Sequence, residues 1–83
     1  MSDYEGPFTL QINSFKESSN AERLKIALEN KYNDVYIAEA DFDNNKYYRV
    51  RIGKFNSLDE AYLIAEALNN EGYSVLISKY DEE

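Results

Sequence analysis

Arginine is concentrated in one short stretch of this acidic chain. Arg49 and Arg51 are two of its three arginines, and they alternate with apolar residues in KYYRVRIGKF, residues 46–55. Every second residue of a strand points the same way, so both guanidinium groups should project from one side of a sheet, together with Tyr47. Because arginine and aromatic side chains dominate recognition surfaces, the stretch predicts a binding face.

Catalytic and metal-binding constellations are absent from the sequence. The chain has no histidine and no cysteine, which removes the commonest general base and the thiolate and imidazole metal ligands. Asp41-x-Asp43-x-Asn45 resembles the start of a calcium loop, but Lys46 replaces the required glycine and Ile52 the closing glutamate. We therefore expect no enzyme activity, no cofactor and no metal.

Length and charge limit the class of partner. The chain has 83 residues, which suffices for one domain, and a formal net charge of -7. This charge argues against nucleic acid or an anionic membrane surface as the main partner. No apolar run approaches the ~20 residues of a membrane span, so we expect no direct membrane insertion. The N-terminus lacks the pattern of a signal peptide. We also expect a monomer.

The two halves of the chain resemble each other. Residues 8–41 align with residues 48–81 without a gap, at a constant offset of 40. Identical pairs are Ile12/Ile52, Phe15/Phe55, Ala21/Ala61, Ala27/Ala67, Leu28/Leu68, Asn30/Asn70, Val35/Val75 and Ile37/Ile77. Shared packing and internal duplication both explain these identities, and both predict the same local structure in each half.

Each half reads as strand, helix, strand. Period-two alternation and helical spacing of apolar residues predict strands near 8–13, 34–39, 47–52 and 74–79, and helices near 19–31 and 58–71. Asp43-Asn44-Asn45 predicts a short turn between the halves. The fold class is therefore α+β: a βαββαβ, RNP- or ferredoxin-like, four-stranded antiparallel sheet with both helices on one face and the other face open.

The helix ends carry their own signals. Ser19 with Glu22, and Ser57 with Glu60, each predict a capping box at a helix start. Gly72 should end the second helix in a left-handed conformation. The first helix has Tyr32 at the equivalent position, so its exit must differ, through Asn30 or Asn33.

Alternation assigns side chains to the open face. They are Thr9, Gln11, Tyr36, Ala38, Tyr47, Arg49, Arg51, Ser74, Leu76 and Ser78. Polar residues on a solvated sheet face also discourage aggregation, and for Arg51 this interpretation is as well supported as binding. For Tyr47 and Arg49 beside Gln11, binding is favoured.

The paired motifs resemble a known family. Leu10-Gln11-Ile12-Asn13-Ser14-Phe15 and Tyr48-Arg49-Val50-Arg51-Ile52-Gly53-Lys54-Phe55, each followed by an alanine-rich helix, resemble the SPOR domain, a peptidoglycan-binding module of bacterial envelope and division proteins. The resemblance covers residues 8–80 and implies the same βαββαβ organisation. It leaves residues 1–7 as an N-terminal tail and 81–83 as an acidic tail.

The resemblance also implies a ligand. SPOR domains recognise denuded glycan strands, from which amidases have removed the stem peptides. The family's glutamine and serine fall on Gln11 and Ser14, and its aromatic residue and arginine on Tyr47 and Arg49. Where the family often has glycine this chain has Asn13, which tolerates a left-handed bend. Our candidate glycan-binding residues are Gln11, Ser14, Tyr47, Arg49, Arg51, Thr9 and Tyr36.

Location and rival functions follow from the same comparison. The resemblance implies an excised domain of a larger exported protein, acting in the periplasm or cell wall and targeting its parent to the wall or division septum. RNA-recognition motifs share the architecture, but their Lys/Arg-Gly-Phe signature is absent and the net charge is unsuitable. A ferredoxin-like small-molecule regulatory or protein-interaction domain is the alternative function.

Overall fold

The computed structural model describes residues 5–80. The expected acidic tail at 81–83 and the first part of the expected N-terminal tail lie outside the described residues. The elements follow in the order β1 (Glu5–Phe15), α1 (Ser18–Glu29), β2 (Val35–Phe42), β3 (Asn45–Ser57), α2 (Leu58–Asn70) and β4 (Leu76–Lys79). The predicted order of strands and helices is confirmed.

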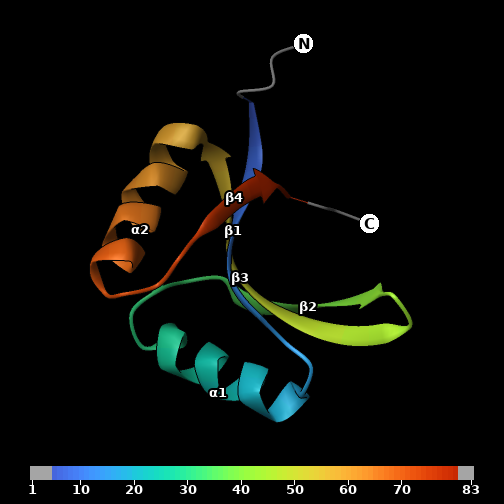
Figure 1. Cartoon of the computed structure of the whole chain (residues 1–83). Helices are drawn as coiled ribbons and strands as arrows, with labels where there is room; N and C mark the ends of the chain where they lie inside the picture. Colours follow the sequence, from blue (N-terminus) through green and yellow to red (C-terminus); the bar gives the residue numbers. More distant parts are fainter. Residues whose placement is uncertain (1–4, 81–83) are drawn as a thin grey trace.

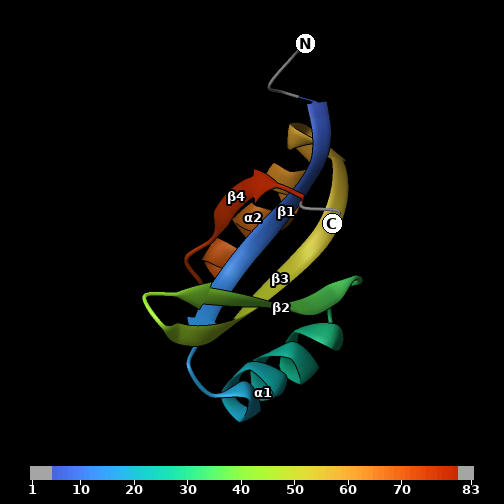
Figure 2. The same cartoon turned by 90° about the vertical axis from the view of Figure 1, so that its right-hand side faces the viewer.

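The four strands form one sheet in the order β2-β3-β1-β4, and every neighbouring pair is antiparallel. The first strand, β1, and the last strand, β4, are therefore neighbours, and β2 and β4 are the edge strands of the sheet. In Figure 1 the hairpin of β2 and β3 extends away from α2. Figure 2 shows the sheet from its uncovered side, with α2 behind β1 and β4 and α1 below β2.

One hydrophobic core joins the sheet to both helices. Its members are Phe8, Leu10, Ile12, Ala21, Leu28, Val35, Val50, Ile52, Ala61, Ala65 and Leu68. Residues of α1 and of α2 belong to the same cluster, which requires both helices to pack on the same side of the sheet. Neither helix within the described residues is long and apolar enough to cross a membrane.

The side of the sheet opposite the helices is called the open face below. Strand register and alternation assign its members. They are Thr9, Gln11 and Ser14 of β1, Tyr36, Ala38, Ala40 and Phe42 of β2, Asn45, Tyr47, Arg49 and Arg51 of β3, and Leu76 and Ser78 of β4.

The two helices begin differently. Ser57 precedes α2, and its hydroxyl accepts a hydrogen bond from the backbone N–H of Glu60 at 3.3 Å. Glu60 reaches back to the N–H of Asn56, so the predicted capping is confirmed with a one-residue shift of the return bond. The capping box predicted at Ser19 is wrong, because α1 already begins at Ser18 and its N-cap residue is Glu17, which makes no side-chain cap.

The turn residues with a positive φ angle are glycine, aspartate or asparagine, which tolerate this conformation. Gly72 has φ of 102°, as predicted for the exit of α2. The exit of α1 uses neither Asn30, which is right-handed at φ -69°, nor Asn33; Asp34 is left-handed at φ 62° instead. Asp43 and Asn44, both at positive φ, form the two-residue hairpin turn between β2 and β3.

The central strands β1 and β3 are longer than predicted, because residues beyond the predicted ends also pair with a neighbouring strand. β1 pairs with β3 from Glu5↔Ser57 to Phe15↔Tyr48, and β3 runs directly into α2 without a loop. β4 is shorter than predicted: it begins at Leu76, so Ser74 is not a strand residue and its assignment to the open face was wrong.

Candidate functional site

A β-bulge in β1 decides which side chains reach the open face. Gln11 pairs with Arg51, but the next two pairs are Asn13↔Val50 and Ser14↔Arg49, which shifts the register by one residue. Strict alternation would turn Ser14 towards the helices with Ile12. The extra residue restores Ser14 to the side of Gln11, since a bulge sets two residues of one strand against one of its partner.

Asn13 supports this bulge through its side chain. Its Oδ1 accepts a hydrogen bond from the backbone N–H of Ser14 at 2.8 Å. The left-handed bend allowed for Asn13 in the sequence is not used, since its φ is not among the positive ones. A short amide side chain that bonds the next backbone group stabilises the irregular turn instead.

Gln11 and Arg51 are joined on the open face. The Nε of Arg51 donates a hydrogen bond to Oε1 of Gln11 at 3.2 Å. This bond uses one of the two lone pairs of Oε1 and leaves the amide nitrogen of Gln11, with two N–H donors, for another partner. It also fixes the guanidinium of Arg51, whose remaining donors stay at the surface. The structure therefore favours a positioned Arg51 over a merely solvated one.

Arg49 lies at the centre of the open face. Its strand partners are Ser14 on one side and Ala38 on the other, both small. Its Nε is buried and has no hydrogen-bond partner among the described residues. No carboxylate within residues 5–80 pairs with Arg49 or Arg51. Because no described residue pairs with this guanidinium, its terminal N–H groups can bind an anionic or oxygen-rich ligand.

Thr9 must be removed from the predicted contact set. It is on the open face but 0% exposed. Its hydroxyl donates to the backbone carbonyl of Ile52 at 3.0 Å, so Tyr36 must donate the 2.9 Å hydrogen bond between the two hydroxyls. Thr9 therefore supports the ring of Tyr36 from below and exposes no surface for direct contact with a ligand.

Tyr36 is further held by an aromatic neighbour that the sequence analysis missed. The Tyr80 ring packs edge-to-face on Tyr36, with centroids 5.9 Å apart. Lys54 places its ammonium 5.2 Å from the centroid of Tyr80. Tyr80 continues the alternation of Leu76 and Ser78, and that signal was sufficient to find it. The result is an aromatic corner at one end of the open face.

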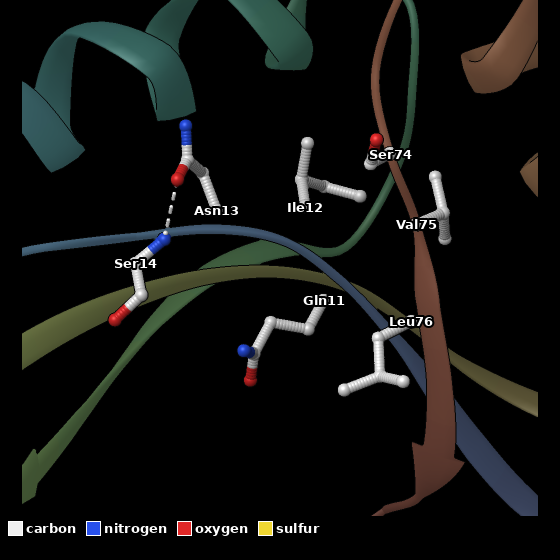
Figure 3. Close-up of a pocket in the computed structure, with 7 residues that line it drawn as sticks. All are labelled: Gln11, Ile12, Asn13, Ser14, Ser74, Val75 and Leu76. Atoms are coloured by element: carbon white, nitrogen blue, oxygen red, sulfur yellow. Dashed lines mark hydrogen bonds between the residues drawn. The ribbon is translucent and has the colours of Figure 1, made fainter.

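A shallow hollow of about 320 Å³ adjoins Gln11 and Ser14, where β1 and the segment before β4 separate. Its lining residues are Gln11, Ile12, Asn13, Ser14, Ser74, Val75 and Leu76. In Figure 3 the side chains of Gln11, Ser14 and Leu76 lie on one side of β1, and those of Ile12 and Asn13 on the other. The amide of Gln11 and the hydroxyl of Ser14 thus border a space that admits a polar ligand group.

Charge is segregated between the two sides of the sheet. The open face carries Arg49 and Arg51, and none of its members within residues 5–80 is acidic. Glu39 and Asp41 of β2 project from the opposite side, by alternation. Among residues 5–80, the open face therefore offers an anion only cations and neutral groups. Within the same residues no cluster of acidic side chains is placed to hold a metal ion.

The architecture is a four-stranded antiparallel sheet with two helices on one side, and comparison with known families identifies the family. The family model described as "SPOR domain" matches residues 4–79, and the chain belongs to the SPOR domain family, known as peptidoglycan-binding modules. SPOR domains occur in proteins of the cell envelope.

A solved structure has the same fold. The SPOR domain of RlpA from Pseudomonas aeruginosa superposes with a TM-score of 0.79 at 23% sequence identity, over 88% of this chain and 99% of that chain. A search of the curated proteins returned no match. The fold class predicted from the sequence is thereby confirmed, while the duplication of the two halves stays a prediction.

Proposed function

We propose that this domain binds denuded glycan strands of peptidoglycan through its open face, and that it thereby targets the protein that carries it to the cell wall or division septum. The observation that carries the proposal is Arg49 at the centre of the open face: no residue within 5–80 pairs with its guanidinium, and no open-face member among those residues is a carboxylate. Removal of a stem peptide leaves a lactyl carboxylate on muramic acid, and a guanidinium can hold it with two charge-assisted bonds.

The neighbouring groups suit the rest of a sugar chain. Gln11 offers its amide N–H groups and Ser14 its hydroxyl to acetamido and hydroxyl groups of the glycan. Tyr47, half-buried one pleat from Arg49, offers an aromatic surface to the apolar face of a sugar ring. Tyr36 of β2, the strand partner of Arg51, offers a second aromatic ring on the open face.

Magnitudes agree with a local mode of recognition. Each well-shielded charge-assisted bond contributes roughly 1.5–3 kcal/mol. Burial of a ring against a sugar adds about 25 cal/mol for each Å² removed from water. The net charge of -7 opposes long-range attraction to an anionic polymer. Short-range bonds on the open face must therefore supply the affinity.

The test is co-sedimentation with purified cell-wall sacculi before and after amidase treatment. We expect the domain to sediment with the treated sacculi more than with intact ones, and not to retain RNA at moderate salt. Equal binding to both preparations would remove the denuded-glycan proposal. Tight RNA binding would favour the rival reading as an RNA-recognition fold.

A further inference from the structure

Phe42 is a large apolar residue that the core does not use. It is 66% exposed and ends β2, immediately before the hairpin turn. The end of the hairpin formed by β2 and β3 lies away from α2 in Figure 1. Single exposed apolar residues are common and need no explanation by themselves. What distinguishes Phe42 is its position on the sheet.

The register places Phe42 on the open face, in line with the proposed glycan site. Its partner is Asn45, and the preceding open-face pair is Ala40↔Tyr47. Phe42 and Tyr47 are therefore diagonal neighbours, a relation within reach of aromatic side chains. Ala38, the partner of Arg49, and Ala40 lie between Phe42 and Tyr36 on β2, and neither projects far above the sheet.

The charged residues of the two hairpin strands leave this path open to an anionic polymer. Glu39 and Lys46 form an ion pair at 3.4 Å on the side of the hairpin opposite the open face. Bonding to the Glu39 carboxylate is the main cause that raises the pKa of Lys46. Asp41 is the strand partner of Lys46 and lies on that same side, away from the open face. The carboxylates of β2 are thus turned away, while the open side of the hairpin keeps Arg49.

We propose that the glycan continues from Arg49 along the hairpin to Phe42, which stacks on a further sugar and makes the domain sensitive to glycan length. This inference rests on the function proposed above. The four residue-to-residue steps from Ala38 to Phe42 span about 13 Å, longer than one sugar ring. A short fragment held at Arg49 does not reach Phe42, whereas a longer strand does.

The test is calorimetric titration of the whole chain with denuded glycans of two lengths, a disaccharide and an octasaccharide. Phe42→Ala should weaken binding of the octasaccharide by about tenfold, the loss typical of an aromatic contact, and leave the disaccharide unchanged. Leu63→Ala is the matched control, since Leu63 is 69% exposed but lies on α2. It should change neither affinity, and thermal unfolding should show all variants folded.

Other outcomes overturn the inference in distinguishable ways. If Phe42→Ala binds both glycans like the parent while Arg49→Ala weakens both, the extension along the hairpin is wrong and the proposed function stands. Equal weakening of both lengths by Phe42→Ala, or any loss with Leu63→Ala, would also refute length sensing through Phe42. If the parent binds neither glycan, the proposed function itself fails.

Discussion

Arg49 and Val50 are neighbours in β3 with opposite surroundings. Val50 is fully buried in the hydrophobic core, whereas Arg49, one residue earlier, holds a buried Nε for which no described residue provides an acceptor. Ile52 and Arg51 repeat the contrast: the first is 1% exposed, and the second is tied to Gln11 at the surface. One strand thus carries buried apolar side chains on its helix side and arginine side chains on its open side.

The difference teaches that stability and binding should be separable in this domain. Burial of apolar surface on the helix side is the main favourable term in folding. The open side contributes little burial and keeps donors without partners, which is unfavourable for folding alone. Substitutions on the two sides of the same strand should therefore affect different measurements.

The largest effect is expected on the buried side. Ile52→Ala should lower the free energy of unfolding by about 2–5 kcal/mol, and Val50→Ala by about 1–3 kcal/mol, through lost burial and the cavity left behind. Urea denaturation measures both. The fraction that remains folded should bind treated sacculi like the parent. Loss of binding by a fully folded Val50→Ala would show that the two faces are assigned the wrong way round.

A smaller effect, on binding alone, is expected on the open side. Arg49→Ala and Tyr47→Ala should each weaken glycan binding by about 1–3 kcal/mol, the range for loss of a charge-assisted bond or an aromatic anchor. Their unfolding free energies should stay within about 0.5 kcal/mol of the parent, since neither side chain belongs to the core. Co-sedimentation and thermal unfolding of the same samples separate the two quantities; unchanged binding would contradict the proposed site.

Thr9 gives the smallest and sharpest test, because it is the buried exception on the open side. Thr9→Val should cost about 0.5–1.5 kcal/mol of unfolding free energy, as the bond to the Ile52 carbonyl and the support of Tyr36 are lost. Tyr36→Phe, which keeps Thr9 bonded to Ile52, should cost less. If Thr9→Val is neutral, this corner of the open side does not contribute to stability.

Much of this architecture could be predicted from local patterns. The alternation around Val50 and Ile52, the helical spacing of Ala61 and Leu68, and the Asp43-Asn44 turn depend on near neighbours in sequence, and the structure agrees with each. The cap at α1 could not be predicted reliably, because several serines compete there and packing of the helix against the sheet decides its start. The far end of the hairpin was underestimated, although Ala40 and Phe42 continue the alternation.

The sequence by itself determined the period of each element, and with it the separation of Arg49 and Arg51 from Val50 and Ile52. Only the tertiary structure decided which residues of other strands join them. Ser14 reaches Arg49 because a bulge in β1 adds one residue to the register, and Thr9 is buried because Tyr36 from β2 closes over it. Both outcomes depend on pairing between strands distant in sequence, which no local pattern encodes.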